Sequence, residues 1–217
     1  IHDGRIGRVF YATLEWTTND IPKGDRDIVF DLAPHPIDVL NYLLGEWPYG
    51  IDAVGNSYRR GRETLEEMAF VNLEFPDRVL ANVYLSWIQQ DGKNRLIRLV
   101  GRDGSLVCDA LNQVVTLYND RDSSDIPQAL FPRLGQYISN GPNGGGSNGV
   151  NCDPHVPNNT IRDMQVHFLD AVRGRGPQFN SAIIGARNVE VLESITKAMR
   201  TRRGVQPMVQ YPQTPIA

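Results

Sequence analysis

The sequence predicts an α+β fold: an open, mostly antiparallel β-sheet with helices packed on one of its faces. Two observations predict it. Between residues 51 and 118, short runs rich in β-branched and aromatic residues alternate with turn-forming residues that permit hairpins. One run with helical periodicity precedes this series and two more follow it.

The first elements are a strand, a loop and a helix. The opening run RVFYATLEW, residues 8–16, is dense in strand-favouring residues. NDIPKGDRD, residues 19–27, is interrupted by proline and glycine and predicts a loop. From Pro36 to Leu44 apolar residues recur at helical spacing, and Gly45 followed by Pro48 supplies a stop.

Six strand-like runs follow, and they predict a meandering antiparallel sheet. They are IDAVGNSY, MAFVNLEF, VLANVYLSW, RLIRLVG, SLVCD and VVTLY, which begin at residues 51, 68, 79, 95, 105 and 114. In VLANVYLSW one face carries only apolar side chains, from Val79 to Trp87, while the other mixes Leu80 and Tyr84 with Asn82 and Ser86. Such a sheet packs helices on both faces or hides one face against another subunit.

Residues 119–157 are polar and glycine-rich and predict a long flexible loop inside a single domain that spans residues 1–217. No predicted strand leads through these glycines directly into a helix, as it does in a phosphate-binding loop. After this loop, Asn158 or Asn159 can cap a helix that ends near Gly174. A second helix begins near Asn180 or Ser181 and runs toward Gly204, and both helices are expected to cover one face of the sheet.

Composition excludes several classes of protein. A formal net charge of -3, with scattered lysines and arginines, offers no basic stripe for nucleic acid. No apolar run approaches the roughly 20 residues that span a bilayer, and the N-terminal residues lack the apolar core of a secretion signal. We therefore expect a soluble, cytoplasmic protein with neither a nucleic-acid nor a membrane partner.

Asp31, His35 and Asp38 form the most suggestive cluster, at the start of the first apolar helical run. If that helix begins by Pro34, the three side chains share roughly one face. A carboxylate near an imidazole fixes its tautomer, as general acid-base catalysis near neutral pH requires. The structural alternative is that Asp31 or Asp38 caps the helix and His35 is a satisfied buried group. A metal site is a third reading, but no second histidine lies nearby in sequence.

Several motifs taken in order resemble the C-terminal half of the Gfo/Idh/MocA oxidoreductases, over nearly the whole chain. The most specific are the DxxxH of Asp31 and His35 and the IDVLNYLLG that follows. The other matching stretches are GRIGRV, LSW, IRLVGRDGSLVCD, HFLDAVRGRGPQF and NVEVLESITKAMRTRRGVQ. The variant DLAPH resembles members that act on sugar nucleotides.

The resemblance implies the substrate-binding and oligomerisation domain of an NAD- or NADP-dependent enzyme. In that family the aspartate and histidine of DxxxH face the substrate near the nicotinamide, which assigns Asp31 and His35 as catalytic and substrate-binding residues. The substrate would be a sugar, a cyclitol or a sugar nucleotide. The open sheet usually forms the subunit interface, so a homodimer or homotetramer is expected. Asp38 is assigned a structural role, and no metal is implied.

The chain departs from the family in having no GxGxxG between a strand and a helix and no EKP motif with its catalytic lysine. A dinucleotide-binding domain is therefore expected to be missing from these residues, which would be inactive by themselves. The alternative is a dimerisation or ligand-binding module of the same fold without chemistry.

Overall fold

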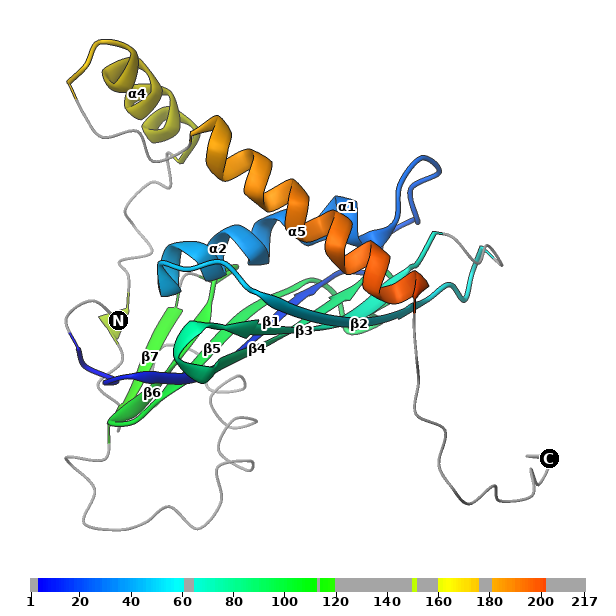
Figure 1. Cartoon of the computed structure of the whole chain (residues 1–217), viewed down its shortest axis with the longest axis horizontal. Helices are drawn as coiled ribbons and strands as arrows, with labels where there is room; N and C mark the ends of the chain where they lie inside the picture. Colours follow the sequence, from blue (N-terminus) through cyan, green and yellow to red (C-terminus); the bar gives the residue numbers. More distant parts are fainter. Residues whose placement is uncertain are drawn as a thin grey trace.

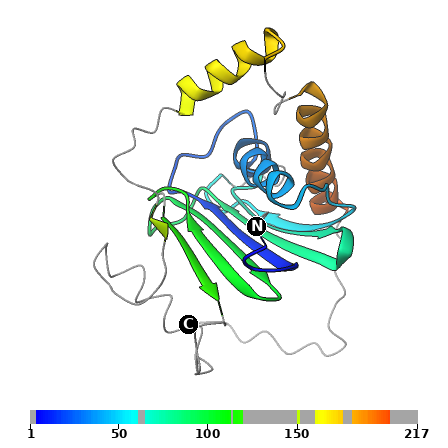
Figure 2. The same ribbon diagram turned by 90° about the vertical axis from the view of Figure 1, so that its left-hand side faces the viewer.

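The computed structural model describes residues 4–60, 65–112, 114–119, 150–151, 160–175 and 181–201. A twisted sheet forms one layer, and α1, α2 and α5 lie together on one side of it (Figure 1). The described residues place no helix against the opposite face (Figure 2). This confirms the predicted α+β class with an open, mostly antiparallel sheet.

In the described part of the chain the sheet has eight strands, in the order β2-β3-β4-β1-β5-β6-β7-β8. Their bounds are β1 Val9–Thr17, β2 Gly50–Asn56, β3 Met68–Phe75, β4 Val79–Ser86, β5 Asn94–Gly101, β6 Gly104–Asp109, β7 Val114–Asn119 and β8 Val150–Asn151. The first seven coincide, within one or two residues at each end, with the strands that the sequence predicts. The long loop predicted at 119–157 lies almost entirely outside the described residues.

The sheet is not a simple meander, because β1 lies in its middle. This strand pairs in parallel with β4, where Leu14 faces Val83, and antiparallel with β5, where Leu14 faces Ile97. A parallel pair needs a long connection. Here α1, α2 and the β2–β3 hairpin supply it between β1 and β4.

Alternation along β4 separates a core face from an open face, as predicted. Val79, Ala81, Val83 and Leu85 are buried, and Trp87, just after the strand, is fully buried. Leu80 on the other face is 55% exposed. The buried face is the one on which the helices pack.

Two helices stand where the sequence predicts one: α1 at Ile28–Leu32 and α2 at Pro34–Leu44. Asp27 caps α1, since its side chain accepts a hydrogen bond from the backbone N–H of Phe30 at 2.9 Å. Gly45 ends α2 in the left-handed conformation, with φ 72°, which confirms the predicted stop.

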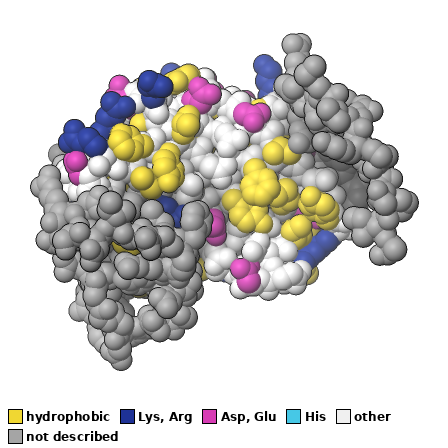
Figure 3. Space-filling model, turned by 90° about the horizontal axis from the view of Figure 1, so that it is seen from below, with side chains coloured by type: hydrophobic (Ala, Val, Ile, Leu, Met, Phe, Trp, Pro, Cys, Tyr) yellow, Lys and Arg dark blue, Asp and Glu magenta, His cyan; other side chains and the backbone are white. Residues whose placement is uncertain are grey.

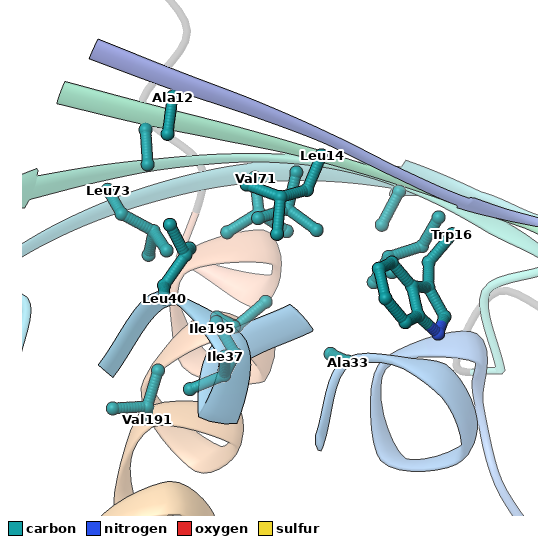
Figure 4. Close-up of a cluster of buried hydrophobic side chains, with 14 of the residues drawn as sticks. Ala12, Leu14, Trp16, Ala33, Ile37, Leu40, Val71, Leu73, Val191 and Ile195 are labelled. Atoms are coloured by element: carbon teal, nitrogen blue, oxygen red, sulfur yellow. The ribbon is translucent and has the colours of Figure 1, made fainter. Parts of the chain in front are cut away.

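The core lies between the sheet and these helices. Figure 4 shows Leu14 and Val71 from the sheet facing Ile37 of α2 and Ile195 of α5. Each of these four side chains is at most 2% exposed. Helix α5 (Ala182–Arg200) is capped by Ser181, as predicted, and packs against β2, α1 and α2.

Helix α4 (Thr160–Val172) differs from its prediction, because it does not cover the sheet. It lies beyond the first turns of α5, away from the strands (Figures 1 and 2). Its apolar side chains are exposed, Phe168 by 67% and Val172 by 70%. Asn158 and Asn159, predicted to cap this helix, lie outside the described residues.

The open face of the sheet carries an apolar patch over β1, β3 and β4. We call Tyr11, Phe70, Leu80 and Tyr84 the open-face patch. Phe70 stacks on Tyr84 with ring centroids 4.9 Å apart, and Tyr11 lies opposite Leu80 in the register. Figure 3 views the molecule from this side and shows hydrophobic side chains gathered on it.

Candidate functional site

Helix α1 places Asp31 one turn after its N-terminus. The backbone N–H of Ile28 donates to the carbonyl of Glu66 at 2.9 Å, which ties the start of the helix to the segment that leads into β3. The backbone N–H of Asp31 donates to the Asp27 carbonyl at 3.3 Å. The short helix is therefore anchored at its beginning, and its last turn carries the carboxylate.

The Asp31 carboxylate contacts two side chains. The indole Nε1–H of Trp87 donates to Oδ2 at 3.1 Å. The Arg26 guanidinium lies 3.8 Å from Oδ1, and the Asp31 side chain is 19% exposed. The carboxylate is thus held by a buried donor on one side and remains partly open to solvent.

His35 is the second residue of α2 and is exposed. Its imidazole lies 6.5 Å from the ring of Trp16 on β1, with the two planes 21° apart. Pro34 and Pro36 flank it, and the Asn188 side chain of α5 donates to the Pro34 carbonyl at 3.0 Å. These contacts fix the start of α2 while the imidazole faces outward.

Asp31 and His35 therefore come from consecutive helices rather than from one. Helix α2 begins at Pro34, as the premise required, but Asp31 lies on α1, which Ala33 joins to α2. Within the part of the chain that the structure describes, no hydrogen bond links Asp31 to His35. Asp38 is exposed on α2, farther along the helix.

Sequence reasoning missed the two tryptophans that hold the pair. Trp16 is 7% exposed and Trp87 is fully buried. An arginine lies on each indole: the Cζ of Arg95 is 5.2 Å from the ring of Trp16, and the Cζ of Arg60 is 5.4 Å from the ring of Trp87. Trp87 is the last residue of the LSW motif, so that motif is the sequence signal that could have pointed to it.

Arg95 and Glu67 are two of the charged groups near the site whose pKa values are displaced. Burial lowers the pKa of Arg95, whose guanidinium donates to the Thr17 and Asn94 carbonyls at 2.8 and 2.7 Å. Burial also opposes ionisation of Glu67, but backbone N–H groups that donate to its carboxylate outweigh this and lower its pKa. The Glu67 side chain is wholly buried.

A cleft of about 410 Å³ lies elsewhere, between α5 and the segment that leads into β2. Trp47, Tyr49, Arg187 and Lys197 are among its lining residues, and neither Asp31 nor His35 is. The candidate pair therefore sits on a different part of the surface.

The residues that the structure describes contain no group of three or more His, Cys, Asp or Glu side chains that could hold a metal ion. None of their helices is both long and apolar enough to span a bilayer. His167, the other described histidine that the sequence offers, lies on α4.

Comparison with known families defines the class of protein. Residues 1–107 match the family model described as the GFO/IDH/MocA C-terminal domain. This stretch contains β1 to β5, the first four residues of β6, and both Asp31 and His35. Residues 1–107, just under half of the chain, are therefore similar to the C-terminal domain of the Gfo/Idh/MocA oxidoreductases.

Solved structures from bacteria share the fold. UDP-N-acetylglucosamine 3-dehydrogenase GnnA from Acidithiobacillus ferrooxidans has a TM-score of 0.70 at 18% identity, and the match covers 92% of this chain and 56% of that chain. Aldose-aldose oxidoreductase from Caulobacter crescentus, complexed with glycerol, has a TM-score of 0.68 at 20% identity, with coverage of 92% and 56%. The WlbA dehydrogenase from Bordetella pertussis, in complex with NADH and UDP-GlcNAcA, has a TM-score of 0.65 at 14% identity, with coverage of 92% and 57%. The chain thus spans little more than half the length of these proteins.

Proposed function

We propose that this chain is the substrate-binding and oligomerisation domain of an NAD- or NADP-dependent oxidoreductase that acts, in the cytoplasm, on a sugar, a cyclitol or a sugar nucleotide. The observation that carries the proposal is the placement of the DxxxH pair. His35 is exposed while its ring lies against the buried indole of Trp16, and Asp31 stands one short helix earlier with a fixed carboxylate. The sugar-related names of the structures that share the fold support the substrate class.

His35 is assigned proton transfer. When a carbinol is oxidised to a carbonyl, its hydroxyl proton must leave, and an imidazole can accept it near neutral pH. His35 is suited to this because it is exposed and fixed at the start of α2 rather than buried in the core. In the reverse direction the same imidazole returns the proton to the carbonyl oxygen.

Asp31 is assigned a role toward the substrate rather than toward His35. No hydrogen bond joins the two side chains in the described structure, so the carboxylate does not fix the imidazole tautomer here. The Asp31 carboxylate is partly exposed, and its Oδ1 accepts no hydrogen bond from the described residues, so it can accept one from a sugar hydroxyl. We therefore infer that Asp31 orients the substrate.

The described residues offer no glycine-rich turn at the start of a helix that would fit a dinucleotide. The sequence places no GxGxxG motif between a predicted strand and a predicted helix, and α2 begins with a proline-rich turn rather than a glycine-rich one. We expect a separate nucleotide-binding domain to supply the nicotinamide, which accepts or donates the hydride when bound. Isothermal titration of these 217 residues with NADH should then show no binding, and tight stoichiometric binding would contradict this expectation.

A second candidate is a ligand-binding or dimerisation module without chemistry. It is favoured by the position of the described cleft, which lies away from Asp31 and His35. In that case the two residues are structural.

The test uses the protein encoded by the complete reading frame. It is screened for reduction of NAD⁺ and NADP⁺ with free sugars, inositols and sugar nucleotides. His35→Ala should lower kcat on the best substrate by about 10²- to 10⁴-fold while the fold is retained. Asp38→Asn is the matched control, since Asp38 is exposed on the same helix, and it should keep near-normal turnover. Near-normal turnover by His35→Ala, or no turnover in the whole screen, would favour the module without chemistry.

A further inference from the structure

Trp87 contacts Asp31 from the interior of the protein. Its side chain is wholly buried just after the end of β4, and its indole N–H donates to Oδ2 of Asp31 at 3.1 Å. We propose that Trp87 is a positioning residue that holds Asp31 with one oxygen engaged and the other turned toward the substrate. This inference rests on the proposed function, because it concerns the same aspartate.

The backbone of Trp87 is fixed at both of its polar groups. Its N–H donates to the Glu67 carbonyl at 3.0 Å, and its carbonyl accepts from the Asp20 N–H at 2.8 Å. The Arg60 guanidinium covers the indole, with Cζ 5.4 Å from the ring centroid. The indole therefore has little freedom to turn away from Asp31.

Two hydrogen bonds and one ion pair in turn hold Arg60. Its Nε lies 3.3 Å from Oε1 of Glu67, one terminal nitrogen donates to the Leu65 carbonyl at 2.8 Å, and the other donates to the Lys23 carbonyl. Only 14% of the Arg60 side chain is exposed. A buried cation in such contacts is costly to displace, because its acceptors would lose their partner.

Glu67, which pairs with Arg60, is itself held by backbone hydrogen bonds. Its Oε2 accepts from the backbone N–H groups of Tyr58 and Arg59 at 3.0 and 2.7 Å, and its Oε1 accepts from that of Arg60 at 2.8 Å. Glu67, Arg60, Trp87 and Asp31 thus form one continuous series of contacts. It begins at a wholly buried carboxylate and ends at a partly exposed one.

The difference between the two carboxylates points to a role toward a ligand. Both oxygens of Glu67 accept short hydrogen bonds, as expected for a purely structural acid. Only Oδ2 of Asp31 accepts one from the described residues, since Arg26 is 3.8 Å from Oδ1, beyond hydrogen-bond distance. Trp87 therefore leaves Oδ1 as the oxygen that can accept a hydroxyl of the substrate.

The first experiment needs no turnover. In the ¹⁵N-labelled protein of the complete reading frame, the indole N–H resonance of each tryptophan is assigned by single substitution with phenylalanine. Asp31→Ala should shift the Trp87 indole resonance and speed its exchange with solvent by about 10-fold, the scale of a lost hydrogen bond to a charged group. The Trp47 indole, which lines the separate cleft, should be unaffected. A Trp87 resonance that does not respond to Asp31→Ala would overturn the proposal.

The second experiment measures turnover, on the substrate found in the screen above. Trp87 is replaced by β-(3-benzothienyl)alanine, which keeps the bicyclic shape and lacks the N–H donor, so folding is preserved. We expect kcat/KM to fall by about 10-fold with an unchanged melting temperature. The same replacement of Trp47 should leave kcat/KM unchanged.

The outcomes distinguish the two proposals. If Asp31→Ala abolishes turnover while the benzothienyl variant at position 87 turns over normally, the positioning role of Trp87 is wrong and the proposed function stands. If Asp31→Ala itself turns over normally, the catalytic assignment of Asp31 is wrong, and the inference about Trp87 fails with it.

Discussion

The imidazole of His35 lies against the indole of Trp16, 6.5 Å between centroids and 21° between planes, and so joins the start of α2 to the middle strand of the sheet. Arg95 also lies on this indole, with Cζ at 5.2 Å from the ring. Trp16 thus serves as a platform for an exposed imidazole, because its own side chain is buried and cannot move without disturbing the core.

Replacement of Trp16 should release His35. Trp16→Leu removes the aromatic surface, and the lost stacking, about 1 kcal/mol, should lower kcat of the complete enzyme by roughly 5-fold. Trp16→Phe, which keeps a ring, should have the smaller effect. The measurement combines steady-state kinetics with the NMR resonances of the His35 ring, which should move in Trp16→Leu.

His167 provides the internal reference for this prediction. It lies on α4, away from the sheet, and its resonances should stay in place in both variants. Equal kcat values for Trp16→Leu and the unaltered enzyme, with an unmoved His35 resonance, would show that the stacking has no part in positioning the imidazole.

Glu67 should make stability depend on pH. Because its pKa in the folded protein lies below its ordinary value of 4.5, folding favours the ionised form. The resulting stabilisation is fully present above pH 4.5 and is lost as the pH falls through the folded-state pKa. Glu67→Gln should cost about 3 kcal/mol of unfolding free energy near neutral pH, since it leaves Arg60 without its ion pair.

Urea unfolding followed between pH 7 and pH 3 would check this. The difference in unfolding free energy between the unaltered protein and Glu67→Gln should be constant at high pH and shrink below about pH 4.5. Glu74→Gln is the matched control, because Glu74 is an exposed residue of β3, and it should change stability little at any pH. A difference that stays constant down to pH 3 would contradict the assignment.

Gly55 and Gly185 should respond in opposite directions to alanine. A Cβ at Gly55 on β2 would lie 2.8 Å from Sδ of Met199 on α5 and 2.9 Å from the Met68 backbone carbonyl on β3, so the Met199 side chain and the pairing of β2 with β3 would both have to shift. Gly55→Ala should therefore cost about 1–3 kcal/mol. A Cβ at Gly185 in α5 meets nothing within 4 Å, so Gly185→Ala should stabilise by about 0.5–1 kcal/mol.

The melting temperatures of the two variants test these opposite changes in stability. Tolerance of alanine at Gly55 with no fall in melting temperature would mean that Met199 and the Met68 carbonyl approach β2 less closely than these distances indicate. Gly185 lies in α5, the helix that carries Met199, so the change in melting temperature of Gly185→Ala measures the helix preference for alanine without a steric clash.

Local patterns in the sequence predicted most of the strands. In β4 the alternation of apolar side chains depends only on residues two apart, so the buried face that includes Val83 and Leu85 could be identified. The central position of β1 could not, because its pairing with β4 joins residues almost 70 positions apart, such as Leu14 and Val83. Hydrophobic periodicity carries no information on such pairing.

The sequence identified the two candidate residues of the site but not the side chains that hold them in place. Asp31 and His35 follow from the DxxxH motif, but Asp31 lies on a helix of its own because Asp27, at the end of the predicted loop, caps that helix. Glu67 reads as a surface residue by composition, since glutamate is rarely buried. Its burial depends on the backbone of residues 58–60 folding over its carboxylate, which only the three-dimensional structure reveals.

The open-face patch is expected to be an interface between copies of the complete protein. Leu80 is 55% exposed at its centre, next to Tyr11 at 44%, on a face that no described helix covers. Leu80→Glu would place a charge in a surface that becomes desolvated on association, so the dimer should weaken by roughly 30-fold or more. Light scattering over a range of concentrations would detect the shift toward monomer.

Phe168→Glu is the control that makes this result specific. Phe168 is 67% exposed on α4, and a charge there removes exposed apolar surface without touching the sheet. Loss of association with Leu80→Glu alone would place the interface on the sheet, since general solubility would respond to both variants. If Phe168→Glu alone produced monomers, the interface would lie on α4. A complete protein that is monomeric before any substitution would remove the open face from the assembly altogether.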